Sequence, residues 1–184
     1  MAIKTFTTGE VLTAADTNTY LANSGLVLVK SQTIGSGVTS IAVTGAFSAD
    51  YDNYKIVISG GVSSIPTSLT LKLGASATGY YGALNYVTYS VGTISVAAVN
   101  NAVSWTYAGS GTASNINASI DLLSPFAAKT TGLISFYTEN ATTGSTGSFN
   151  GFHNVATSYT DFTIGIGAGN ATGGTITVYG YRKA

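Results

Sequence analysis

The sequence predicts an all-β domain, an antiparallel jelly-roll-like β-sandwich preceded by a short N-terminal arm with one short helix. Three observations lead to this fold class. From residue 26 onward, apolar and polar residues alternate with a period of two, as in strands with one buried face. The alternating segments are rich in Val, Ile, Thr, Tyr and Phe. Glycine-rich turn signals separate them at short intervals, and no second long helix is expected.

Residues 1–25 form the predicted arm, because they lack this alternation. Thr13 is a candidate helix cap, Asp16 lies three positions later, and Gly25 supplies a stop signal. We therefore expect a short helix over residues 14–23. Its apolar residues are too few to stabilise it alone, so the helix needs a surface to lie on.

The rest of the chain, residues 26–184, is one predicted β-sandwich domain with about nine to eleven strands. An up-and-down barrel is the alternative architecture. The expected strands include residues 26–29, 38–43, 54–59, 69–73, 84–91, 103–107, 116–122, 133–138, 162–166 and 175–181. The expected turns include residues 59–61, 109–111, 144–147 and 173–174.

Charge is scarce in this chain. Charged residues make up 8% of the sequence, and seven basic residues balance seven acidic ones. Because the basic residues are scattered, they form no stripe that would neutralise nucleic-acid phosphates, and we expect no nucleic-acid partner. Low net charge favours association, which suits a protein held in a larger assembly.

The sequence has no cysteine, which excludes disulfides, thiolate nucleophiles and cysteine metal sites. The first ten residues have no apolar core of a secretion signal. The longest aliphatic run is also far shorter than the ~20 residues of a membrane span. We therefore expect a soluble protein that is made in a cytoplasm and has no membrane partner.

No catalytic, cofactor-binding or metal site is predicted. His153 is the only histidine, Asp161 is the nearest acid in sequence, and the surrounding residues match no nucleophile or metal motif. Asp50 and Asp52 could place oxygens near Ca²⁺, but the segment lacks the glycine and glutamate of an EF-hand loop, so we expect a turn there. No pair of acids suggests glycoside hydrolysis.

Tyrosines are abundant, with twelve in the chain. Aromatic side chains on a surface with little charge can stack on sugars or fill protein interfaces. A role in the core is the alternative for about half of them. The densest cluster, which supplies the candidate ligand contacts, is Tyr80, Tyr81, Tyr86 and Tyr89.

Three stretches resemble bacteriophage virion proteins and together cover about a fifth of the chain. Residues 6–18, which contain the pattern G-x-V-L-T-A-A, resemble the opening of many phage minor tail, fibre and virion-attached proteins. Residues 170–181 resemble the closing strand of jelly-roll phage proteins. Residues 119–130, with Ser124-Pro125-Phe126, resemble a strand and loop in the middle of such domains.

The resemblance implies a non-enzymatic structural component of a phage virion, either a capsid decoration or head-fibre protein or a tail fibre. Such a protein is made in the host cytoplasm and resides in the virion. Its arm docks on other virion proteins, its β domain is exposed, and it usually forms a homotrimer. The apolar arm residues that would dock are Phe6, Val11, Leu12, Tyr20 and Leu21.

Two alternatives remain open at this point. A receptor-binding tail protein would bind a host surface glycan through loops and aromatic residues. A polysaccharide-degrading spike enzyme is disfavoured, because the chain is short and lacks paired acids.

Residues 26–29 bear on the oligomeric state, because they are apolar on both faces of their strand. Burial of the second face against a neighbouring copy would form a homotrimer or another small ring. The competing explanation is that the arm covers this strand within one chain.

Overall fold

A computed structural model describes residues 7–16 and 25–183. These residues form fourteen strands and one helical turn, and the paired strands are all antiparallel, which confirms the predicted fold class. The elements are α1 Ala14–Asp16, β1 Leu26–Thr33, β2 Ser40–Val43, β3 Tyr51–Ser59, β4 Val62–Ser63, β5 Thr67–Leu73, β6 Tyr80–Thr88, β7 Ile94–Ala102, β8 Trp105–Gly111, β9 Ile116–Leu123, β10 Thr131–Thr138, β11 Ser145–His153, β12 Phe162–Ile166, β13 Ala171–Thr172 and β14 Thr175–Arg182.

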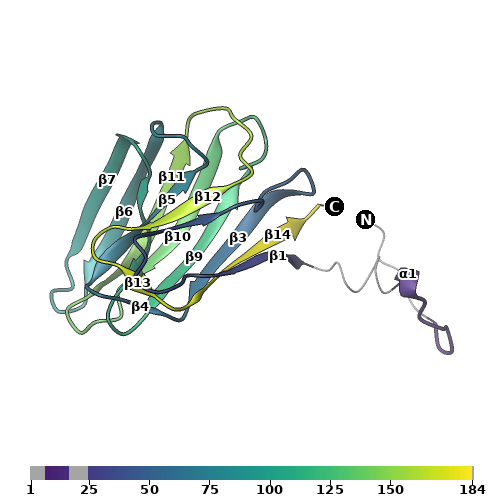
Figure 1. Cartoon of the computed structure of the whole chain (residues 1–184), viewed down its shortest axis with the longest axis horizontal. Helices are drawn as coiled ribbons and strands as arrows, with labels where there is room; N and C mark the ends of the chain where they lie inside the picture. The colour runs from purple at the N-terminus through teal and green to yellow at the C-terminus, as the bar shows by residue number, and fades with distance from the viewer. Residues whose placement is uncertain (1–6, 17–24, 184) are drawn as a thin grey trace.

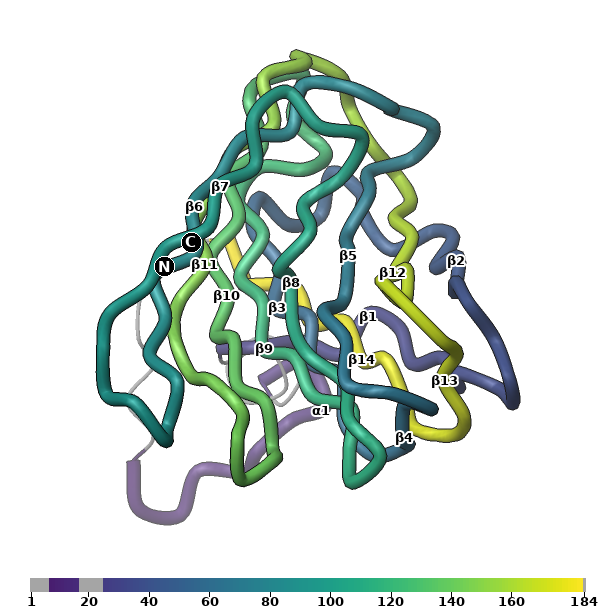
Figure 2. Tube along the Cα trace, turned by 90° about the vertical axis from the view of Figure 1, so that its left-hand side faces the viewer, coloured from purple at the N-terminus to yellow at the C-terminus, as the bar shows by residue number. Residues whose placement is uncertain are grey.

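Twelve of the strands form one continuous sheet that folds over into two layers (Figure 1). The large layer has the order β1-β14-β3-β9-β10-β11-β6-β7, and the small layer has the order β2-β12-β5-β8. Figure 2 shows β8 beside β9, where Ser110 and Gly111 pair with Asn117 and Ile116 and join the layers. Because the chain passes repeatedly from one layer to the other, the fold is a jelly-roll-like sandwich.

The hydrophobic core lies between the layers, because alternate residues of each strand point inward. From the large layer, Ile56 of β3 and Ile120 of β9 are fully buried. They face a small layer whose strand β5 buries Leu69, Leu71 and Leu73. The predicted alternation in these strands is therefore confirmed, and the residues between the buried ones point to the outer face of each layer.

The β1 edge of the large layer is closed by polar side chains. The ladder with β14 shifts register between Leu28 and Lys30. Beyond this bulge, Lys30 Nζ donates to the Thr44 carbonyl at 2.6 Å, and Gln32 Nε2 donates to the Ala42 carbonyl at 2.9 Å. These bonds tie β1 to β2 and its following loop, in addition to the packing of Val29 against the core.

One predicted turn is wrong and another is misplaced. Residues 109–111 end β8, whereas of residues 144–147 only Gly144 lies in the turn, because β11 begins at Ser145. A Cβ at Gly109 would lie 2.5 Å from that of Ala118, and one at Gly147 would lie 2.0 Å from the Asn85 carbonyl oxygen. These glycines therefore allow close packing rather than a chain reversal.

Strands β4, β7, β11 and β13 were not predicted, so the described residues form more strands than the nine to eleven expected. Strand β6 begins at Tyr80, four residues before the expected start. The other predicted turns are confirmed. Gly60, Gly61, Gly173 and Gly174 all have positive φ, which glycine adopts readily.

The predicted helix start is confirmed at Thr13. The Asp16 backbone N–H donates to Thr13 Oγ1 at 3.1 Å, and the Thr13 N–H donates to Asp16 Oδ2 at 3.2 Å. This reciprocal pair is a capping box with aspartate in the third position. The described helix α1 covers Ala14–Asp16, and residues 17–23 of the predicted helix lie outside the described part of the chain.

Candidate functional site

The outer face of the large layer carries a broad group of apolar side chains over β9, β10, β11, β6 and β7. Side chains at paired positions of antiparallel strands lie on the same face. Phe136 of β10 pairs with Ser148 of β11, which in turn pairs with Asn85 of β6, and Asn85 pairs with Val96 of β7. The surface that we call the outer apolar patch consists of Tyr81, Ile94, Val96, Leu123, Ile134, Phe136 and Phe152.

Several of these side chains are unusually exposed for their type. Phe136 is 63% exposed and Val96 is 72% exposed, whereas their strand neighbours on the inner face are buried or half-buried. Tyr81 stacks on Phe152 with ring centroids 5.0 Å apart and an angle of 10° between the planes. Large contiguous apolar patches on a soluble domain usually mark an interaction surface.

The patch carries no formal charge. Strands β6, β7, β10 and β11 contain no Asp, Glu, Lys or Arg. The bordering charges are Lys55 and Asp121, whose Nζ and Oδ2 atoms form an ion pair at 2.9 Å. The Tyr181 hydroxyl also donates to Asp121, which raises the pKa of Tyr181 to about 12. The border is thus electrically compensated within the chain.

A shallow depression of about 310 Å³ lies within the patch. Its lining includes Val87, Ile94 and Phe136, together with the small polar side chains Thr146 and Ser148. This hollow has neither an acid nor a base among its lining residues. It can accept an apolar side chain from another molecule, but it holds no group for acid–base or nucleophilic chemistry.

The four candidate tyrosines do not share one surface. Tyr80 is fully buried, and its hydroxyl accepts a hydrogen bond from the Leu73 N–H at 2.7 Å. Burial raises the pKa of Tyr80 to about 12. Tyr86 points inward and lines a cavity of about 230 Å³ with Tyr107 and Tyr137. Tyr89 is exposed just after β6, so of the four only Tyr81 belongs to the outer apolar patch.

His153 lies in a buried aromatic cluster at one end of the sandwich. Its ring stacks on Tyr80 with centroids 4.2 Å apart, and Nε2 shares a hydrogen bond of 2.8 Å with the Tyr159 hydroxyl. Burial lowers the pKa of His153. Asp161 is engaged elsewhere, because its Oδ1 accepts from the Gly45 N–H at 2.6 Å. The aromatic cluster is therefore part of the packed interior, and His153 is not exposed to solvent.

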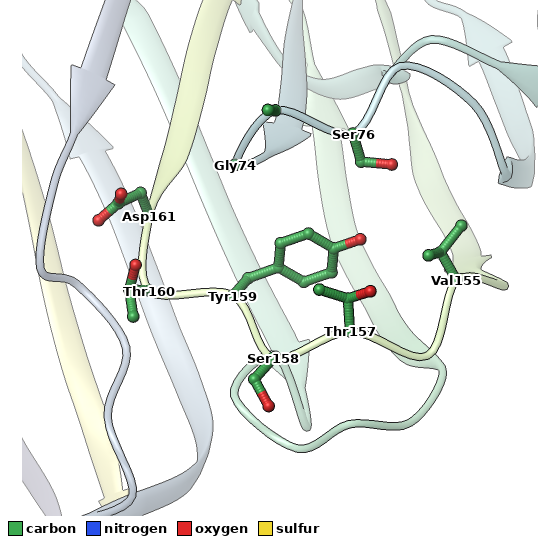
Figure 3. A pocket seen from close by; sticks show the side chains of 9 residues that line it. Gly74, Ser76, Val155, Thr157, Ser158, Tyr159, Thr160 and Asp161 are labelled. Carbon is green, nitrogen blue, oxygen red and sulfur yellow. The ribbon is translucent and has the colours of Figure 1, made fainter.

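A second hollow of about 400 Å³ lies beside this cluster (Figure 3). The Tyr159 ring lies between the loop at Gly74 and Ser76 and the segment at Thr157 and Ser158. Most side chains around it carry hydroxyl groups, and Asp161 supplies the one carboxylate in the lining. The hollow is therefore a shallow depression whose side chains can form hydrogen bonds.

Asp50 and Asp52, the acids considered and rejected as a calcium site, have separate partners. Asp50 Oδ2 accepts from the Ser48 hydroxyl at 2.9 Å, and Asp52 pairs with Lys183 at 2.8 Å. Asp50 lies in a turn just before β3, as predicted. Within residues 7–16 and 25–183, no group of three or more His, Cys, Asp or Glu residues could hold a metal ion.

Two of the predicted docking residues of the arm are described. Val11 is 80% exposed and Leu12 is about half exposed, and α1 contributes no buried residue. Phe6, Tyr20 and Leu21 lie outside the described residues. The segment before the sandwich thus presents apolar side chains to the surface beside a capped helical turn.

Sequence reasoning missed the outer apolar patch. The signal was present in β10, where Leu133, Ile134, Phe136 and Tyr137 are apolar on both faces. The same signal was recognised only at residues 26–29. There, Val27 and Val29 are half-buried while Leu26 and Leu28 are exposed.

Comparison with known proteins adds no relative to this picture. No protein-family model, curated protein or solved structure matches the chain. None of the helical residues described forms a segment that is long and apolar enough to cross a membrane.

Proposed function

We propose that this protein is a non-enzymatic structural component of a bacteriophage particle, either a capsid decoration or head-fibre protein or a tail fibre. Its N-terminal segment docks on other virion proteins, and its β domain is exposed as a homotrimer or another small closed ring. The resemblance of residues 6–18, 119–130 and 170–181 to phage virion proteins supports this assignment.

The observation that carries the proposal is the outer apolar patch. A surface of this kind is stable in water when another protein covers it, which suits an assembly component. The exposed Val11 and Leu12 supply a second apolar contact in the N-terminal segment, which is expected to dock.

The assignment is tested by the protein content of purified particles. A phage that encodes this chain is propagated, banded in a density gradient and analysed by quantitative mass spectrometry. We expect the chain in the particle fraction at a fixed ratio to the major capsid protein. A chain that stays in the unassembled lysate fraction contradicts the proposal.

A receptor-binding tail protein is the second candidate function. The hollow beside Tyr159 favours it, because the hydroxyls of Ser76, Thr157 and Ser158 could bond a sugar's hydroxyl groups (Figure 3). A glycan array probed with the wild-type chain and with Thr157→Trp, which fills the hollow, tests this candidate. Binding that is lost in Thr157→Trp and retained in the control Leu28→Lys, an exposed residue outside both the hollow and the outer apolar patch, supports it. The absence of binding by the wild type removes it.

A further inference from the structure

We infer that the outer apolar patch is the surface through which copies of this chain pack against one another. This inference rests on the proposed function, because it identifies the contact that holds the proposed oligomer together. It also relocates that contact, from the strand at residues 26–29 to the face formed by β10, β11, β6 and β7.

The first argument is charge. When a surface meets its own copy, any net charge on it is repeated on the other side of the contact, so a patch with a large net charge of one sign resists self-association. The outer apolar patch has no Asp, Glu, Lys or Arg in its four central strands. The flanking Lys55 and Asp121 neutralise each other. Two copies therefore meet without repulsion, whereas a partner that is recognised by its charge finds nothing to pair with.

The second argument is area. With about 150–200 Å² for a whole large apolar side chain, the exposed fractions of the patch residues amount to on the order of 600 Å². A stable protein interface buries about 800 Å² on each partner. The small residues between the apolar ones, including Ala83, Asn85, Ala98 and Ser148, extend the same face toward that value. The area fits a folded partner better than a small ligand.

The third argument is the composition of the face. Its centre carries Phe136, its periphery carries the stacked Tyr81 and Phe152 rings, and short polar side chains lie between them. Aromatic residues in an uncharged centre are the usual anchors of protein interfaces. The depression beside Phe136 offers a neighbouring copy a recess for one such side chain.

The alternative contact at β1 is smaller. Leu28 is 60% exposed on the same outer face, but its strand contributes only Leu26 beside it. Beyond the bulge, the Lys30 and Gln32 side chains are already bonded to the carbonyls of Thr44 and Ala42. The edge at β1 is thus closed within one chain, and Leu28 provides a matched control for the patch.

The inference is tested by the mass of the full-length protein in solution. Sedimentation equilibrium is measured from about 1 to 50 µM, the range in which a weak to moderate interface is populated. We expect the wild type to be a defined oligomer. Phe136→Lys and Val96→Lys each place a charge in the patch, and we expect each to weaken association by on the order of a hundredfold. Leu28→Lys, on the same face but outside the patch, is expected to associate like the wild type.

Folding of each variant is checked by far-UV circular dichroism and by the emission of Trp105, the only tryptophan, which is fully buried. If Phe136→Lys does not fold, the association of Val96→Lys, whose residue lies on the edge strand β7, tests the inference.

A wild type that is monomeric throughout the range overturns the inference, as does a Leu28→Lys variant that dissociates while the patch variants remain associated. A monomeric chain that is still found in purified particles overturns this inference and the proposed oligomer, but it leaves the assignment to the virion in place. An oligomeric chain that is absent from particles overturns the proposed function alone.

Discussion

The Tyr159 hydroxyl lies 2.8 Å from Nε2 of His153, and both side chains are buried. This contact joins the end of β11 to the segment that leads into β12, so it ties the large layer to the small one. The other ring nitrogen, Nδ1, has no hydrogen-bond partner among the described residues. Besides the Tyr159 hydrogen bond, ring contacts hold the imidazole, which stacks on Tyr80 and meets Trp105 edge-on.

Protonation of His153 is expected to destabilise the fold. Burial lowers its pKa in the folded state, while the unfolded chain retains an ordinary pKa of about 6.5. Below pH 6.5 the unfolded state therefore binds a proton that the folded state does not. The stability that the fold gains from keeping His153 neutral is fully present above pH 6.5, and it is lost as the pH falls toward the lowered pKa.

The measurement is urea unfolding between pH 5.5 and 7.5, followed by Trp105 fluorescence. Because His153 is the only histidine, a His153→Phe variant should show a nearly flat free energy of unfolding over this range. A wild-type free energy of unfolding that does not rise with pH contradicts the prediction.

Removal of the Tyr159 hydroxyl is expected to leave His153 Nε2 without its partner. We predict that Tyr159→Phe lowers the free energy of unfolding by about 1–3 kcal/mol, the cost of a buried polar group that loses its hydrogen bond. Chemical denaturation at pH 7.5 measures the change. Tyr89→Phe, at an exposed tyrosine, is the matched control and should change stability by less than ~0.5 kcal/mol. Equal effects of the two substitutions would show that the hydroxyl contact is not structural.

Gly147 is expected to tolerate no side chain. A Cβ there would lie 2.0 Å from the Asn85 carbonyl oxygen and 2.7 Å from Tyr86 Cα, so Gly147→Ala must push β11 and β6 apart. Overpacking of this kind costs about 1–3 kcal/mol. Gly132→Ala is the control, because its nearest neighbour is a Leu123 side-chain atom at 3.3 Å. A thermal midpoint that falls no further for Gly147→Ala than for Gly132→Ala would refute the close-packing role.

Deletion of residues 1–24 is expected to leave the sandwich folded, because α1 contributes no buried residue. The truncated chain should retain its β-type circular dichroism and a thermal midpoint within a few degrees of the full chain. A truncated chain that is unfolded at 25 °C would mean that the segment is part of the core.

The sequence was sufficient to predict the fold class and those strands in which large apolar residues alternate regularly with small polar ones. Residues 162–166 and 175–181 were predicted almost to their ends, because Ile and Val at every second position face the core. The capping box at Thr13 was also predictable, since it depends on residues three positions apart.

Strand β11 was not predictable by the same reasoning. Its inward positions include Gly147 and Gly151, which single-sequence rules assign to turns. They are glycine because Tyr86 and the Trp105 ring occupy the space where a Cβ would be. The need for glycine at these positions comes from strands β6 and β8, which are distant in sequence. The local sequence pattern of β11 therefore cannot reveal that these glycines lie in a strand.

The outer apolar patch could be predicted only in part. Apolar residues on both faces of β10 were visible in the sequence, but their alignment with Val96 depends on the order β10-β11-β6-β7. The tyrosine cluster illustrates the reverse problem. Neighbours such as Tyr80 and Tyr81 point to opposite faces of β6, so closeness in sequence separates them in space.

The measurement that tests the account most directly compares particle incorporation of two full-length variants. Val11→Asp with Leu12→Asp places two charges in the docking segment, whereas Thr157→Asp changes an exposed loop of the sandwich. Particles are purified from cells that supply each variant in place of the wild type, and the chain is quantified against the major capsid protein. The account predicts normal incorporation of Thr157→Asp and loss of the double variant from the particles. A chain that is absent from particles in its wild-type form, or a double variant incorporated as fully as the wild type, would contradict it.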